Sequence, residues 1–231
     1  MTTSVVAFLP GWVEPVVRYM ATEGLKGTAT IAAESVAASA VIGVLLGTLM
    51  TLDSKPLKAA IRLYIELWRG LPLIVTIFVI FFVLPEVEIR LSAIQAAAAG
   101  LSLWGSAQVA EATRGAVQSI PREQHEAASA LGFGWVGRHA FVIVPQALRR
   151  LLPPMVSLLV NVIQNSTLAG LIGAVELLFA AKIQVERIAG PPPAGLAQVH
   201  AVEIYGGLMI VFFAISFPLT RLAAYLEKRL A

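Results

Sequence analysis

The sequence contains no cysteine and few charged residues. Without thiols it can form no disulfide, no cysteine metal site and no thiolate nucleophile. Only 13% of its 231 residues are charged, against about 25% in a typical soluble domain, and 58% are hydrophobic. The mean hydropathy is +0.80. So few charged residues could hardly cover the surface of a water-soluble domain with polar groups. In a bilayer, the surface that faces lipid does not need such groups. The composition therefore predicts an all-α integral membrane protein.

Charge-free gaps divide the chain into segments long enough to cross a membrane. The gaps lie between Glu34 and Asp53, Arg69 and Glu86, Arg90 and Glu111, Arg150 and Glu176, and Glu203 and Arg221. A helical span needs about 20 mostly apolar residues. We therefore expect one membrane domain, residues 1–231, with five spans near 27–52, 63–85, 91–112, 148–172 and 202–224. Residues 12–22 are expected to form a short interfacial helix, because Trp12 and Tyr19 favour the headgroup level.

Polar residues and prolines interrupt two of the predicted spans. The stretch Arg69–Pro72 breaks the second, and Pro153 with Pro154 lies near the start of the fourth. The second half of the fourth carries the polar cluster Asn161, Gln164, Asn165, Ser166 and Thr167. Polar groups at membrane depth are costly and tend to face a cavity, so Arg69 and this cluster are candidates for lining a solute path. The alternative is hydrogen bonding between helices, which these residue types commonly supply.

The basic residues alternate between the two sides of the predicted membrane domain. One side holds twelve, namely Lys55, Lys58, Arg62, Arg69, Arg114, Arg122, Arg138, Arg149, Arg150, Arg221, Lys228 and Arg229. The other holds five, namely Arg18, Lys26, Arg90, Lys182 and Arg187. Because cytoplasmic loops are enriched in Lys and Arg, we expect the N-terminus outside, and the 114–150 connection and the C-terminus inside. The net charge of +3 thus reflects topology and gives no basic patch for nucleic acid.

The glycines of Gly132-x-Gly134-x-x-Gly137 have the spacing of a dinucleotide-binding fingerprint. That fingerprint needs a strand before it, a helix after it and an acidic residue about 20 positions on. Here residues 121–131 are predicted to form a helix that stops at Gly132, and no acidic residue follows before Glu176. Nucleotide binding at this site is not expected. Because the chain also has no G-x-x-x-x-G-K-[ST], any ATP hydrolysis must belong to another chain.

The sequence gives no sign of an enzyme. His125, His139 and His200 share no metal-ligand spacing such as H-E-x-x-H, and no serine stands in a nucleophile elbow. We expect all three histidines to be surface residues and the chain to hold no metal.

The stretch 126–145 carries a known motif. Glu126-Ala127-Ala128, Gly132 and Val142-x-Val144-Pro145 resemble E-A-A-x3-G-x9-I-x-L-P, the EAA motif of bacterial ABC importer permeases, with Val at the Ile and Leu positions. Over residues 24–230 the chain is similar to the polar amino-acid uptake branch of that family. The other stretches that carry the resemblance are Tyr64–Pro72, Ala110–Ala128, Val144–Arg149 and Gln164–Leu177.

The resemblance implies the type I ABC importer permease fold, with about five transmembrane helices and a short cytoplasmic coupling helix and turn over 121–137. It implies a second permease protomer, in a homodimer or heterodimer, and two ATPase subunits that bind the ATP and Mg while this chain binds no cofactor. It also implies an extracytoplasmic amino-acid-binding protein and a bacterial cytoplasmic membrane. Glu126, Ala127, Ala128 and Gly132 would form the ATPase contact.

The resemblance also implies a substrate site. Arg69, beside Gly70, would pair with the α-carboxylate of an amino acid, and Asn165, Ser166 and Thr167 would meet its ammonium group or side chain. Asn165 stands where many permeases for cationic substrates have Asp, and Gln164 replaces a usual Lys. Because no carboxylate then neutralises a cationic side chain, glutamate, aspartate or glutamine is favoured as the substrate over a basic amino acid. A protomer that leaves the substrate to its partner stays an alternative.

A channel or secondary transporter without an ATPase is the main rival, because five spans with an interrupted helix suit such proteins too. The segment 119–145 distinguishes the two classes, since a channel has no need of it.

Overall fold

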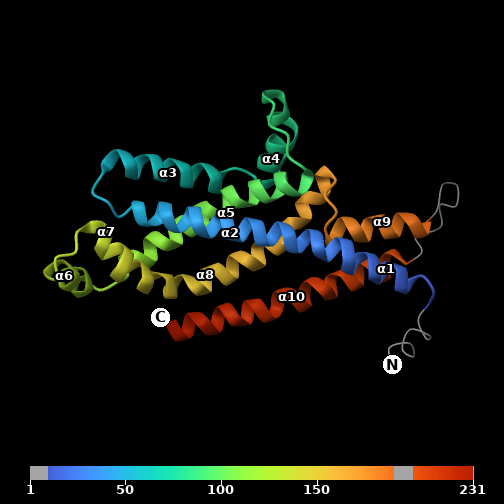
Figure 1. Ribbon diagram of the computed structural model, residues 1–231. Helices are drawn as coiled ribbons and strands as arrows, with labels where there is room; N and C mark the ends of the chain where they lie inside the picture. The colour runs from blue at the N-terminus through green and yellow to red at the C-terminus, as the bar shows by residue number, and fades with distance from the viewer. Residues whose placement is uncertain (1–9, 190–199, 231) are drawn as a thin grey trace.

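The chain folds into an elongated bundle of α-helices. The structure, a computed structural model, describes residues 10–189 and 200–230, and within these ranges it contains no strand. The helices are α1 (Val13–Tyr19), α2 (Leu25–Leu49), α3 (Lys55–Gly70), α4 (Leu73–Phe78), α5 (Ala93–Gln118), α6 (Arg122–Ala130), α7 (Trp135–Arg138), α8 (Val144–Asn165), α9 (Leu177–Ala189) and α10 (Ala201–Leu230). Figure 1 shows α1 and α9 at one end of the bundle, and α6, α7 and the end of α10 at the other. The prediction of an all-α protein is confirmed.

Most of the predicted spans correspond to long apolar helices. In the described part of the chain, Val13–Leu49, Trp135–Ile172 and Ala201–Leu230 are long and apolar enough to cross a membrane, and α3 with Leu73–Val87 makes a fourth if that bent pair counts as one span. The third predicted span lies in α5, which has 26 residues but is not apolar enough to count by composition. Neighbouring helices surround α5, so its polar side chains are shielded from lipid.

The N-terminal region departs from the prediction. Residues 12–22 do not form a separate interfacial helix, because α1 continues through the π-helical turn Met20–Gly24 into α2. The result is one helical stretch of 37 residues, Val13–Leu49. No proline separates the two parts, and a glycine inside a helix costs only about 1 kcal/mol, so Gly24 does not end it.

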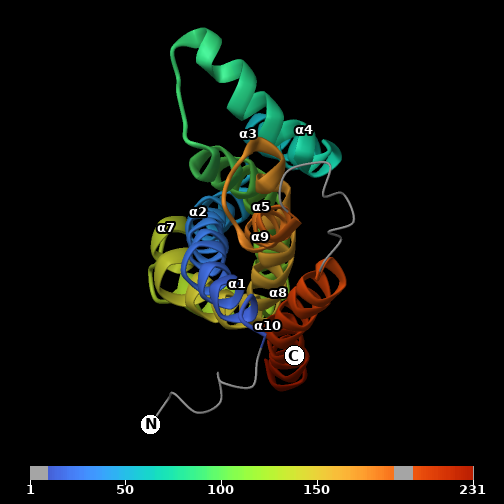
Figure 2. The same ribbon diagram turned by 90° about the vertical axis from the view of Figure 1, so that its right-hand side faces the viewer.

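The predicted break in the second span is confirmed. Leu71 and Pro72 are extended, and α3 and the helix Leu73–Val87 meet at 100°. The proline ring has no N–H for the helical ladder and disfavours the helical conformation of the residue before it. Figure 2 shows α4 turning away from the other helices. The break therefore places Arg69 and Gly70 at a sharp corner of the chain.

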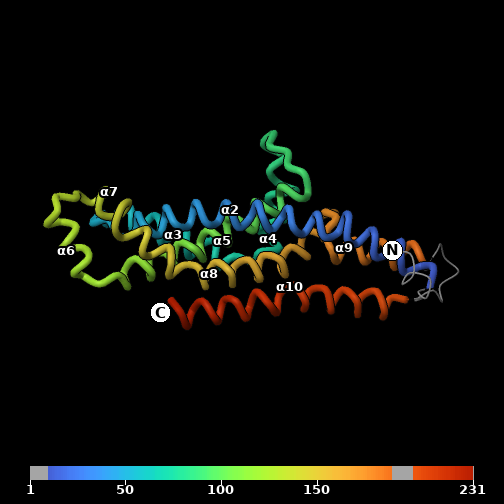
Figure 3. The backbone as a smooth tube through the Cα atoms, turned by 60° about the horizontal axis from the view of Figure 1, so that its bottom comes forward, coloured from blue at the N-terminus to red at the C-terminus, as the bar shows by residue number. Residues whose placement is uncertain are grey.

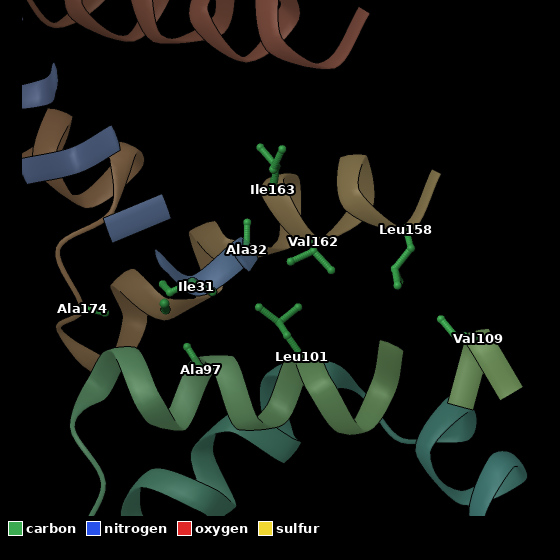
Figure 4. Packing of buried hydrophobic residues seen from close by; sticks show 10 residues of the cluster. Ile31, Ala32, Ala97, Leu101, Val109, Leu158, Val162, Ile163 and Ala174 are labelled. Atoms are coloured by element: carbon green, nitrogen blue, oxygen red, sulfur yellow. The ribbon is translucent and has the colours of Figure 1, made fainter. Parts of the chain in front are cut away.

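The core lies where α2, α5 and α8 pack together. In Figure 4, Leu101 of α5 points toward Ile31 of α2 and Val162 of α8, and all three side chains are fully buried. Small side chains bring α2 close to α5: the hydroxyl groups of Ser35 and Ser39 donate to carbonyl oxygens of α5 at 3.3 Å. Close approach through small residues is typical of helix pairs in membranes.

The connection between the fourth and fifth predicted spans contains a further helix, α9, which covers Leu177–Ala189. The sequence predicts a stiff extended spacer only at Gly190–Pro193, and that stretch lies outside the described residues. Figures 1 and 3 show α10 running the length of the bundle beside α8.

We predict that Gly47→Ala destabilises the bundle. A Cβ at Gly47 would stand 2.5 Å from the Cβ of Thr113 and would collide with the carbonyl oxygen of Ala110, both on α5. Overpacking of this kind costs about 1–3 kcal/mol, which should lower the midpoint of thermal unfolding of the detergent-purified chain by several degrees. Gly206→Ala in α10 is the control, since nothing lies within 4 Å of its Cβ position. A Gly47→Ala midpoint at or above that of the control would contradict the close packing.

Candidate functional site

The predicted helix over 121–131 is present as α6, at the end of the bundle where α10 ends (Figure 1). Pro121 precedes its first residue, and Glu123 lies in its first turn, where a carboxylate interacts favourably with the helix dipole. The helix has only 9 residues and a single buried one, Ala128. It therefore projects from the bundle with most of its surface uncovered.

Gly132 ends α6, as the sequence predicted. Its φ is +85°, in the left-handed region. The N–H of Gly132 donates to Ser129 O at 3.0 Å, and the N–H of Phe133 donates to Ala128 O at 3.1 Å, which is the bond pattern of a Schellman motif. Nothing lies within 4 Å of a Cβ at Gly132, so its φ, and not crowding, calls for glycine. The chain turns here into α7 and back toward α8.

We call residues 122–138 the coupling segment. The Nε of Arg122 donates to Glu126 Oε1 at 2.7 Å, so this carboxylate has an ion-pair partner on its own helix. Ala127 is exposed, whereas Ala128 is only 2% exposed and packs inward. Large apolar side chains nearby are more than two-thirds exposed, namely Leu131, Val136 and, just beyond the segment, Phe141. Such a surface, apolar with a small-residue centre, fits the contact of another protein.

The prediction that His139 is a surface residue was wrong. Its side chain is only 4% exposed, and its ring stacks on that of Trp135 with 4.1 Å between the ring centroids. His125 of α6 lies beside it, at 6.2 Å between ring centroids. Burial lowers the pKa of His125, and the positive charge of Arg138 lowers that pKa further. The sequence missed this cluster because His125 lies in the predicted helix and the other three residues lie beyond its stop at Gly132, so that only the path of the chain brings them together.

The polar cluster of the fourth span ends α8 and begins the 3-10 helix Ser166–Ile172. Asn165 donates from Nδ2 to Asn161 O, Ser166 from its hydroxyl to Ile163 O, and Thr167 from its hydroxyl to Gln164 O, each at 2.8 Å. Ser166 is fully buried. These bonds keep the hydrogen-bonding groups of the three side chains paired with the backbone of their own segment.

The structure places two of the predicted substrate residues, Arg69 and Thr167, at separate cavities. Arg69 lines a cavity of about 260 Å³ between α3 and α5, together with the Glu111–Arg114 ion pair. Thr167 lines another, of about 200 Å³, beside Glu176. Gly70 ends α3 and is exposed. In the described part of the chain, Arg69 and Thr167 therefore do not share either of these cavities.

A third cavity, of about 350 Å³, lies between α5 and α8, and its polar lining includes Trp104, Gln108 and Asn161. No charged side chain is among the described residues that line it. The sequence placed Asn161 in the polar cluster but not among the binding residues. The available signal was that Gln108 and Asn161 are amide side chains within two predicted spans, where polar groups tend to face a cavity. No group of three or more metal-ligating side chains is found in the described part of the chain.

Comparison with known proteins agrees with this architecture. Residues 39–231 match the family described as binding-protein-dependent transport system inner membrane component. The chain is 33% identical over 207 residues to the probable glutamine ABC transporter permease protein GlnP of Bacillus subtilis, covering 90% of this chain and 92% of that protein. It is 32% identical over 210 residues to the glutamine transport system permease protein GlnP of Escherichia coli, covering 90% and 91%.

A solved structure of an amino acid ABC transporter with histidines superposes with a TM-score of 0.76 at 24% identity, covering 96% of this chain and 99% of that one. This likeness shows the fold, while the matched family covers most of the chain. The chain therefore belongs to the family of binding-protein-dependent inner membrane transport components and is the membrane permease subunit of an amino-acid ABC transporter.

Proposed function

We propose that this chain forms half of a translocation path and that its coupling segment docks on an ATPase subunit. The uncovered α6, with its exposed apolar neighbours, is the observation that carries the proposal. ATP and Mg are bound by two such ATPase subunits, and an extracytoplasmic binding protein delivers the amino acid. When the ATPases close, the two coupling segments of the assembly move together, and the attached helices rock between outward-open and inward-open arrangements.

The same end of the bundle faces the cytoplasm in this proposal. Arg122 and Arg138 lie in the coupling segment, and Lys228 and Arg229 end α10 at that end of the bundle (Figure 1). The excess of basic residues on this side supports an inside location, with the N-terminus outside and the C-terminus inside the bacterial cytoplasmic membrane.

The second protomer packs against the helical arm Leu73–Val87, which turns away from the bundle at the 100° bend (Figure 2). This arm exposes the large apolar side chains Val75, Phe78, Val79, Phe82, Val83 and Val87. Lipid also accommodates apolar side chains. The arm projects from the bundle, however, and so offers a surface on which the helices of a second protomer can pack.

The substrate is a polar amino acid without a cationic side chain, and glutamine fits best among glutamine, glutamate and aspartate. The cavity between α5 and α8 has a suitable volume for a small ligand, since such sites begin at about 300 Å³. The amides of Gln108 and Asn161 can each donate and accept hydrogen bonds, which matches a substrate amide. No lining carboxylate would neutralise a cationic side chain. The names of the two curated relatives support the same choice.

Arg69 is the proposed partner of the substrate α-carboxylate, beside Gly70 at the bend. Its cavity also holds Glu111, whose carboxylate pairs with Arg114 at 2.5 Å. Glu66 also lines this cavity, but no ion pair of Arg69 is found among the described residues, so its guanidinium is available to an anion. Asn165, Ser166 and Thr167 are proposed to meet the rest of the substrate once their backbone bonds rearrange in the assembled path.

We predict that Asn161→Leu lowers glutamine uptake by about tenfold or more. The substitution leaves a bound substrate amide without a partner, and an unpaired buried polar group costs about 1–3 kcal/mol. Radiolabelled uptake is measured in cells that lack only this gene and carry the variant. Thr220→Val in α10 is the control, because Thr220 donates only to Ser216 O of its own helix. The unaltered gene, returned to the same cells, should restore glutamine uptake. If it restored only the uptake of arginine or lysine, the proposed substrate class would be contradicted.

We predict that Gly132→Ala weakens the ATPase contact whereas Gly134→Ala leaves it intact. Neither glycine has an atom within 4 Å of its Cβ position, so the two substitutions differ only in backbone conformation. A side chain at the φ of +85° of Gly132 costs about 1–2 kcal/mol, while the φ of −68° of Gly134 suits any residue. The amount of ATPase that co-purifies with each variant is the measurement. Equal amounts for both would contradict the docking role of the α6 turn.

Glu126→Lys is the second variant of that experiment. Both partners of the Arg122–Glu126 pair are exposed, so we expect normal membrane insertion with lost uptake. Normal uptake and normal ATPase association in this variant would overturn the assignment of the coupling segment.

A further inference from the structure

His139 joins the end of α2 to the coupling segment. The coupling segment is continuous in the chain with α5 and, through the turn His139–Ile143, with α8, but α2 lies far from it in sequence. Thr51, in the turn after α2, stands 88 positions from His139, and its Oγ1 lies 3.1 Å from His139 Nε2. The imidazole is thus a buried link between two parts of the fold that lie far apart in the sequence.

The hydrogen bonds fix how this cross-link works. His139 Nδ1 lies 2.9 Å from Trp135 O, and a carbonyl oxygen only accepts, so Nδ1 carries the ring proton. In the neutral ring Nε2 then accepts, and the Thr51 hydroxyl must donate to it. The same hydroxyl stands 2.7 Å from Thr48 O, a second acceptor. The Thr51 hydroxyl has one proton and two acceptors in reach. At any moment it therefore donates either to His139 Nε2 or to Thr48 O.

Because the Thr51 hydroxyl has this second acceptor, it loses no hydrogen bond when its contact with His139 opens. When His139 moves away, the Thr51 hydroxyl turns to Thr48 O, and the hydroxyl keeps a hydrogen bond in both positions. Seven buried side-chain polar atoms in the described part of the chain have no partner, and three of them surround this joint: Thr48 Oγ1, Trp135 Nε1 and Arg138 Nε. Because buried polar groups are normally paired, we take their concentration here as support for a joint with a second arrangement.

We propose that His139 and Thr51 form a releasable latch that passes the motion of the coupling segment to α2. This inference rests on the proposed docking of that segment on an ATPase. His139 is a positioning residue, since it touches neither substrate nor nucleotide. Because α2 packs along α5 in the core, a displacement of the latch end tilts α2 together with the wall of the proposed path. Without the hydrogen bond between His139 and Thr51, the ATPase would still dock, but only part of the movement of the coupling segment would reach α2.

The test uses the full transporter with its ATPase and binding protein in liposomes, and it measures amino acid transported per ATP hydrolysed. Thr51→Val keeps the shape of the side chain and removes the hydroxyl, and His139→Phe keeps a ring for Trp135 to stack on. We expect Thr51→Val to lower the transport-to-hydrolysis ratio by about fivefold, the equivalent of one lost hydrogen bond. His139→Phe also removes the bond from Nδ1 to Trp135 O and should lower the ratio at least as much. Thr51→Ser restores the hydroxyl and should transport within about twofold of the unaltered chain.

An unchanged ratio in both Thr51→Val and His139→Phe would overturn the latch. Loss of the ratio in Thr51→Ser as well as in Thr51→Val would overturn it too, because the hydroxyl would then not be the cause. Failure of the proposed docking looks different, since the ATPase would not co-purify with the unaltered chain at all.

The absence of cysteine allows a direct test of release. A Thr51→Cys, His139→Cys double variant can be joined by a short bifunctional thiol reagent without labelling any other position of this chain. We expect the joined protein to stop transporting and to recover when a reducible reagent is cleaved. Transport at the unjoined rate while the bridge is intact would overturn the release step.

Discussion

A polar group inside a bilayer must find its partner within the protein, and most of this fold follows from that constraint. Helices satisfy their own backbone, so the described chain is built almost wholly from them. The hydroxyl groups of Ser35 and Ser39 pair with carbonyl oxygens of α5, which draws α2 and α5 together. The polar groups of α2 and α5 thus face each other at their contact, and large apolar side chains such as Val41 and Leu45 of α2 and Met209 and Phe213 of α10 are left exposed for lipid.

The same constraint explains where the chain departs from regular helices. At Leu71–Pro72 the ladder is interrupted, and the exposed residues Arg69 and Gly70 stand at the corner. At the end of α8 the polar side chains Asn165, Ser166 and Thr167 return hydrogen bonds to the preceding turn. These two irregular places hold five of the residues proposed to meet substrate, while Gln108 and Asn161 lie within the regular helices α5 and α8. Irregular backbone at membrane depth persists where it lines a protein cavity.

The end of the bundle with α6 is not under this constraint, because in the proposed topology it lies outside the bilayer, where water can hydrogen-bond to its polar groups. A helix of 9 residues can project there with one buried alanine, and the glycine at φ +85° can turn the chain sharply. The joint beneath it is nevertheless buried and polar, with His139 between Thr51 and Trp135. This uncovered surface, beside a joint with unpaired groups, fits the proposed docking of an ATPase and the proposed release of the latch.

The sequence alone determined the membrane class, the positions of most spans, the break at Arg69–Pro72, and the helix with its stop at Gly132. Charge-free runs, proline and glycine act locally, so their effects can be predicted without knowing the rest of the fold. Only the tertiary structure decided the 100° bend, the burial of His139 and the cavity between Gln108 and Asn161. These depend on which distant segments meet, as Thr51 and His139 do, and a charge pattern carries no information about such contacts.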